Sequence, residues 1–188
     1  SNIQNSIDLL EYLQIKNFDL LDNYMENRIF FKKKDDANQR KIYLWIKHCD
    51  NLIKDKEIKE YKSSNIPLLL QELKIERNRP FNKERLIRIF ENYGIYLVIE
   101  DAITGTKARG CMVVKKNNPA IYMTKCYKEK DSFYYALYHE IKHVKTDYNK
   151  AKAKILIDDD VEKKADSFAL NEMIPEKIWQ EILENYDQ

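Results

Sequence analysis

The sequence predicts an α+β fold: a helical N-terminal region, then a small three-stranded antiparallel sheet, then a pair of helices. Three observations favour this order. Apolar residues recur at steps of three and four in the first part of the chain, which has no glycine between Ile3 and Ile75. After Gly94 the apolar runs become short, β-branched and aromatic, as in strands. Two longer amphipathic segments with helical spacing follow.

Turn and capping residues set the bounds of the predicted elements. Pro67, after two serines and an asparagine, suits the first turn of a helix. Asn82 is a favourable N-cap for the next helix, and Gly94 ends that helix. The three strands and the last two helices are expected at Ile95–Glu100, Cys111–Val114, Ala120–Thr124, Asp131–Thr146 and Asp160–Met173.

We place a domain boundary near residue 80. Residues 1–80 form the helical N-terminal region, and residues 81–188 contain the sheet and the helix pair. A length of 188 residues suits one domain, or one domain with a small helical annex. Hydrophobic residues make up 44% of the chain, which is enough for a packed core and excludes disorder as a global description.

Charge and cysteine content narrow the classes of function. With 33 basic and 31 acidic residues the formal charge is +2, which is too balanced for nucleic-acid binding to be the default. No apolar run is long enough to span a membrane and none resembles a secretory signal, so we expect a cytoplasmic protein. Cys49, Cys111 and Cys126 are odd in number and form no CxxC pair, so we expect them to be reduced and buried.

The strongest motif lies in the first of the two long helices, where residues 139–143 read His-Glu-Ile-Lys-His, an HExxH. Residues four apart on an α-helix differ by about 40° in projection, so the imidazoles of His139 and His143 can face one metal ion. Glu140 lies about 100° from His139, where its carboxylate can reach a water on that ion. The alternative is a surface helix in which two histidines are four apart by chance.

Glu162 and Asp166 form a second pair at a spacing of four, on the last predicted helix. A helical wheel places both carboxylates in the middle of an apolar face. Because burial of an unpaired charge is costly, this pair needs a cation. Lysine or arginine can supply it. The more specific interpretation is a metal ion on Glu162 and an imidazole N–H on Asp166.

HExxH followed by ExxAD resembles the gluzincin arrangement of metallopeptidases. FYYALYHEIKH followed by VEKKADSFALNEMIP is similar to the ImmA/IrrE family, and Tyr43–Lys47 resembles a segment that follows an Xre-type helix-turn-helix in HigA-like regulators. The resemblance implies a zincin-like domain that binds Zn²⁺ and cleaves a regulatory protein, either a helix-turn-helix repressor or an antitoxin. The roles it implies are zinc ligands at His139, His143 and Glu162, a general base at Glu140, and an acid that supports a ligand at Asp166.

Two features depart from the family pattern. Lys142 stands where the family usually has glycine, but the wheel places it on the outer face of the helix, away from the metal. No helix-turn-helix is recognisable before Ile42, so any DNA-binding module is expected ahead of Ser1.

A peptide substrate is expected to lie extended along the strand Ala120–Thr124, taken as a sheet edge. The oxyanion donor is less evident, because Tyr135 and Tyr138 project away from the site on the wheel; Tyr148 is the candidate. Two other classes of function stay open. One is a non-proteolytic transcriptional regulator or antitoxin component that uses the same fold to bind a partner or an effector, which the basic stretch Arg28–Lys62 favours. The other is a helical scaffold without a metal.

Overall fold

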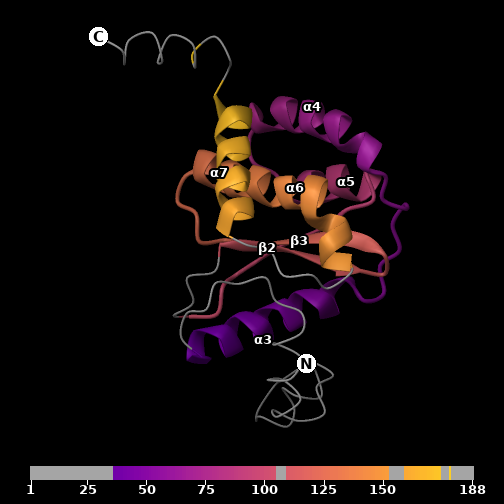
Figure 1. Ribbon diagram of the computed structural model, residues 1–188, viewed down its shortest axis with the longest axis vertical. Coiled ribbons are helices and arrows are strands. Elements are labelled where there is room, and N and C mark those ends of the chain that lie inside the picture. Colours follow the sequence, from indigo (N-terminus) through magenta and orange to yellow (C-terminus); the bar gives the residue numbers. More distant parts are fainter. Residues whose placement is uncertain (1–35, 105–108, 153–158, 175–177, 179–188) are drawn as a thin grey trace.

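The computed structural model describes residues 36–104, 109–152, 159–174 and 178. In this part of the chain, helices cover both faces of a three-stranded sheet: α3 lies beneath it and α4 to α7 lie above it (Figure 1). In chain order the elements are α3 (Asp36–Ile53), the 3₁₀ turn η1 (Ser63–Asn65), α4 (Ile66–Arg77), α5 (Lys83–Asn92), β1 (Tyr96–Glu100), β2 (Gly110–Lys115), β3 (Asn118–Thr124), α6 (Lys130–Lys152) and α7 (Asp159–Met173).

The sheet is mixed, with strand order β1-β3-β2, so the prediction of three antiparallel strands was wrong for one of the two pairings. β2 and β3 are antiparallel, as expected. They are joined by a tight turn at Lys116 and Asn117, both with positive φ (47° and 65°), the backbone geometry that two-residue hairpins favour. β1 and β3 are parallel. The longer connection from β1 to β2 carries the chain to the far edge, so the hairpin returns β3 beside β1 and in the same direction.

Each face of the sheet belongs to a separate apolar core. Alternate side chains of a strand point to opposite faces. Leu97 and Ile99 of β1 therefore pack under α4, α5 and α6, whereas Tyr96 and Val98 pack against α3. β3 is buried along its whole length because it is the central strand and has helices on both sides.

The predicted capping residues have the expected roles. Pro67 lies in the first turn of α4. Asn82 is the N-cap of α5, and its side-chain oxygen accepts a hydrogen bond of 2.7 Å from the backbone N–H of Arg85. Gly94 has φ +75° just beyond α5, and a Cβ there would lie 2.7 Å from backbone atoms of Tyr61. Both the conformation and the close approach require glycine at this position.

The described part of residues 1–80 packs into the same unit as the residues after the predicted boundary. α4 shares the upper core with α5 and α6. The buried Glu76 of α4 also binds Arg85 of α5, with an Nη2 to Oε1 distance of 2.7 Å. The helices expected before Phe31, and the segment in which no helix-turn-helix was recognised, lie outside the described residues.

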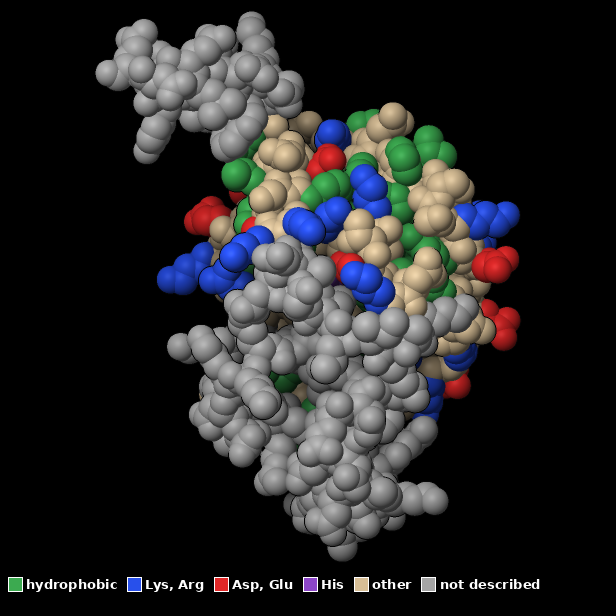
Figure 2. Space-filling model, viewed as in Figure 1, with side chains coloured by type: hydrophobic (Ala, Val, Ile, Leu, Met, Phe, Trp, Pro, Cys, Tyr) green, Lys and Arg blue, Asp and Glu red, His purple; other side chains and the backbone are tan. Residues whose placement is uncertain are grey.

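Figure 2 shows Lys and Arg side chains gathered over α6 and α7 on the face viewed. Of the three cysteines, all free, Cys49 and Cys111 are buried as expected, but Cys126 is exposed. Among the described residues, no helix combines the length and the apolar character needed to cross a membrane.

Candidate metal centre

The orientation of α6 is fixed by its apolar stripe. Phe133, Leu137, Ile141 and Val144 are all buried in the upper core. Because a helix has one rotational setting that buries such a stripe, the neighbouring face is left to point toward α7, which packs along α6. The HExxH histidines lie on this neighbouring face. α6 also continues past the predicted end near Thr146, to Lys152.

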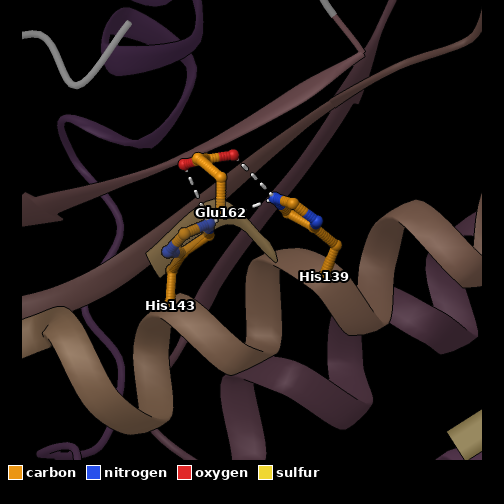
Figure 3. Close-up of side chains that lie close together, drawn as sticks. All are labelled: His139, His143 and Glu162. Carbon is orange, nitrogen blue, oxygen red and sulfur yellow. Dashed lines mark hydrogen bonds and ion pairs between the residues drawn. The ribbon is translucent and has the colours of Figure 1, made fainter. Parts of the chain in front are cut away.

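The structure brings together the three residues expected to bind a metal. The Nε2 atoms of His139 and His143 lie 3.1 Å apart. The Glu162 carboxylate reaches across from α7, with one oxygen 3.3 Å from His139 Nε2 and the other 3.5 Å from His143 Nε2 (Figure 3). Within the described part of the chain, this is the one group of three His, Cys, Asp or Glu residues whose donor atoms converge in this way.

These distances fit a tetrahedral metal site. Zn²⁺ bonds of about 2.0–2.1 Å to nitrogen and oxygen place neighbouring donors about 3.3 Å apart. Here the two Nε2 atoms are 3.1 Å apart, His139 Nε2 lies 3.3 Å from one oxygen of the Glu162 carboxylate, and His143 Nε2 lies 3.5 Å from the other. Two imidazoles and one carboxylate also form the ligand set that catalytic zinc sites use, in which the fourth position is left for water or substrate. The residues present therefore fit zinc.

Asp166 contacts His139 at Nδ1, the ring nitrogen that does not face the other candidate ligands. Its Oδ1 atom lies 2.9 Å from His139 Nδ1, and it also accepts a hydrogen bond of 3.1 Å from the Tyr135 hydroxyl. The expectation that Tyr135 projects away from the site was therefore wrong: it precedes His139 by one helical step of four residues and shares its face. The expectation that both acids of α7 are buried in an apolar face was also wrong, because the Glu162 and Asp166 side chains are 40% and 59% exposed.

Asp147 contacts the second histidine in the same way, and the sequence interpretation missed it. Its Oδ2 atom lies 3.1 Å from His143 Nδ1 and accepts a 2.9 Å hydrogen bond from the Thr146 hydroxyl. Asp147 is only 2% exposed, so its charge is little screened by water. The signal that could have found it is an acid four residues after the second histidine of HExxH.

The two carboxylates behind the imidazoles orient the ring nitrogens. An Nδ1–H that donates to a carboxylate leaves the Nε2 atom of a neutral imidazole able to bind a metal. Burial acts to lower the pKa of His139, but the hydrogen bond to Glu162, the charge of Glu140 and the bond to Asp166 outweigh it and raise that pKa to about 9. Burial lowers the pKa of His143.

Glu140 lies beside the centre and is shielded from water. It is 7% exposed, and burial raises the pKa of its carboxyl to about 7, although the neighbouring His139 opposes this shift. The first residue of β2 is a glycine that leaves room for this side chain: a Cβ on Gly110 would lie 3.2 Å from Glu140 Oε1 and 2.9 Å from Met123 Sδ. The glycine at the start of β2 therefore leaves space for the carboxylate of the candidate general base.

The predicted oxyanion donor, Tyr148, lies further along α6. Its hydroxyl donates to the carbonyl of Asn117 in the β2–β3 turn, and its ring packs edge-on against Tyr61 with centroids 4.9 Å apart. Tyr138 points into the core, as expected.

Comparisons with known proteins found no matching family model, no matching curated protein and no matching solved structure. The similarity to the ImmA/IrrE family therefore depends on the residues of the two motifs and stays a prediction.

Proposed function

We propose that the chain is a zinc-dependent endopeptidase in which His139, His143 and Glu162 hold the metal and Glu140 is the general base. One observation carries this proposal: two imidazole nitrogens and the Glu162 carboxylate converge, and each imidazole also contacts a second acid through its Nδ1 atom. A helix pair that was only structural would have no need to place two imidazole nitrogens and a carboxylate against one another. The proposal therefore accounts for an arrangement that is otherwise costly.

The chemistry follows from the position of Glu140. When bound, zinc would polarise a peptide carbonyl and lower the pKa of a nearby water toward 7. The Glu140 carboxylate would take a proton from the attacking water and pass it to the nitrogen of the leaving amine. Burial raises the pKa of the Glu140 carboxyl, and the charge of a bound zinc ion would oppose that shift and favour the carboxylate form that accepts the proton.

The peptide substrate would pair with the outer edge of β2. The strand predicted for this role, Ala120–Thr124, lies within β3, which is central and hydrogen-bonded on both sides, so that prediction was wrong. β2 is an edge strand of the sheet, it packs against α6, and it begins at Gly110 beside Glu140. An extended peptide added to β2 would gain main-chain hydrogen bonds and pass close to the general base.

The resemblance to the ImmA/IrrE family adds a substrate class to this proposal. It implies that the substrate is a regulatory protein of the helix-turn-helix repressor or antitoxin type and that cleavage takes place in the cytoplasm. The alternative is a regulator that binds metal and a partner without cleaving it. The two differ in one requirement, because only hydrolysis needs a carboxylate at position 140.

Metal content tests the metal centre directly. We expect about one zinc ion per chain in protein purified without chelator, measured by inductively coupled plasma mass spectrometry. Glu162→Ala should lose it, whereas Glu84→Ala, a change at an exposed residue of α5, should not. A wild-type content near zero that stays near zero after incubation with equimolar zinc would refute the proposal.

Cleavage tests the activity. We expect the zinc-loaded chain to cleave quenched fluorescent casein, and Glu140→Gln to retain zinc while its rate falls by at least 100-fold. Equal cleavage by wild type and Glu140→Gln would show that the activity is a contaminant. Zinc binding with no cleavage of casein or of a helix-turn-helix repressor would favour the non-proteolytic regulator.

A further inference from the structure

A separate cavity of about 370 Å³ opens between the segment that leads into α4 and the C-terminal half of α6. Its volume lies within the range of small-molecule binding sites. None of the three candidate metal ligands, nor Glu140, lines it. The lining residues are Tyr61, Lys62, Ser63, Ser64, Val144, Lys145, Thr146, Tyr148 and Asn149.

The chemistry of this lining favours an anion. It contains two lysines, five hydroxyl groups and an amide, but no aspartate or glutamate. In the described part of the chain, neither Lys62 nor Lys145 forms an ion pair; the Lys145 ammonium instead lies over the Phe168 ring, 5.4 Å from its centroid. Two acids outside the lining act on it. Asp147 accepts a hydrogen bond from the Thr146 hydroxyl, and the charge of Glu60 adds to the effect of burial in raising the pKa of Tyr148. The lining itself contains two cations and no acid.

Two serines of the lining lie next to Lys62 in the chain. Ser63 and Ser64 begin η1, which leads directly into the 12-residue helix α4. Lysine ammonium groups and serine hydroxyls are a donor set suited to a phosphate group.

The lining also contains two aromatic side chains. Tyr61 and Tyr148 pack edge to face, with their planes at 67°, and both line the cavity. The Tyr61 hydroxyl donates to the backbone carbonyl of Val144, and the Tyr148 hydroxyl donates to that of Asn117. These hydrogen bonds hold both rings in fixed positions. Aromatic side chains held in this way can pack against a planar base.

We infer that this cavity binds a small phosphate ester with a planar base, a mononucleotide, with its phosphate on Lys62, Lys145 and the serines and its base against the tyrosine pair. The inference is independent of the proposed peptidase activity, since the cavity contains neither a metal ligand nor the general base. It gives the chain a second site, for a ligand of a different class from a peptide.

Isothermal titration of the full chain with AMP, GMP, CMP, UMP and inorganic phosphate tests this site. We expect at least one mononucleotide to bind with Kd below about 1 mM, and more tightly than inorganic phosphate, because the phosphate alone leaves the aromatic wall unused. Lys62→Gln and Lys145→Gln should each weaken that binding by about fivefold or more. Lys163→Gln removes a charge from an exposed residue outside the lining and should leave it unchanged.

Three results would overturn the inference. The first is no binding of any of these probes at 10 mM. The second is binding that neither Lys62→Gln nor Lys145→Gln weakens. The third is an equal loss in Lys163→Gln, which would mean general attraction to a basic surface rather than a site. Circular dichroism of each variant establishes that it is folded.

Discussion

Replacement of Asp147 by asparagine isolates the charge behind the second histidine. Both contacts that the structure gives Asp147 at the centre, from His143 and from Thr146, fall on the same oxygen, Oδ2. An asparagine amide oxygen in that place can accept both hydrogen bonds. The substitution therefore removes the negative charge while it retains the geometry.

The size of the effect follows from the burial of this contact. A hydrogen bond to a charged group contributes about 1.5–3 kcal/mol and one between neutral groups about 0.5–1.5 kcal/mol. The midpoints of these ranges differ by about 1.2 kcal/mol, which is close to a factor of ten in affinity. Because Asp147 is 2% exposed, water does not screen this difference. We expect Asp147→Asn to weaken zinc binding by about tenfold, within the range known for groups that support metal ligands.

Asp166→Asn is the matched control. The contact has the same chemistry, from Asp166 to His139 Nδ1 at 2.9 Å, but this side chain is 59% exposed. Solvent screening should reduce the loss of zinc affinity to about threefold or less. Competition with a chromophoric zinc chelator at fixed pH and ionic strength measures both variants. An effect below twofold in Asp147→Asn, or a larger one in Asp166→Asn, would refute this reasoning.

Three further substitutions or modifications test other parts of the structure. Gly110→Ala should lower the rate of peptide cleavage by at least tenfold with unchanged zinc content, because its Cβ would lie 2.9 Å from Met123 Sδ and 3.2 Å from Glu140 Oε1 and would force both side chains to shift. Unchanged kinetics would contradict this. Gly94→Ala should lower the free energy of unfolding by more than about 1–2 kcal/mol, because φ is +75° and the Tyr61 backbone would lie 2.7 Å from the new Cβ. An unchanged midpoint of urea unfolding would contradict this prediction. Ellman's reagent should modify one thiol, Cys126, in the folded chain and all three after denaturation; three fast thiols in the folded chain would contradict the burial of the other two.

The helix pair could be predicted because its signals are local. A spacing of four residues defines which side chains share a helical face, whatever the rest of the fold does. The same rule would have placed Tyr135 and Asp147 in the centre, because they continue the row of His139 and His143 at steps of four in both directions. The spacing rule does not predict how exposed these side chains are, because their exposure depends on how far α7 covers α6. Hence the exposure of Asp166 was predicted wrongly.

The direction of each strand could not be predicted from the alternation of apolar and polar residues alone. A strand has the same side-chain pattern whichever way its neighbour runs, and pairing is decided by connections and by the helices on each face. One signal for the central strand was available: the run Ala120–Met123 is apolar at consecutive positions, which is typical of a strand covered on both faces. It argued against a substrate-binding edge at β3 and in favour of one elsewhere.

The candidate centre thus has two parts that depend on different regions of the fold. The groups that would hold zinc lie on α6 and α7, and their geometry depends on the packing of these two helices. The group that would move protons, Glu140, lies on α6, and its carboxylate is close to the start of β2, where Gly110 leaves room for it. Changes at the sheet edge should therefore alter catalysis while zinc affinity is retained, and changes behind the imidazoles should alter zinc affinity first. A variant of either kind that lowered the cleavage rate and the zinc affinity equally would mean that the two parts of the centre do not act separately.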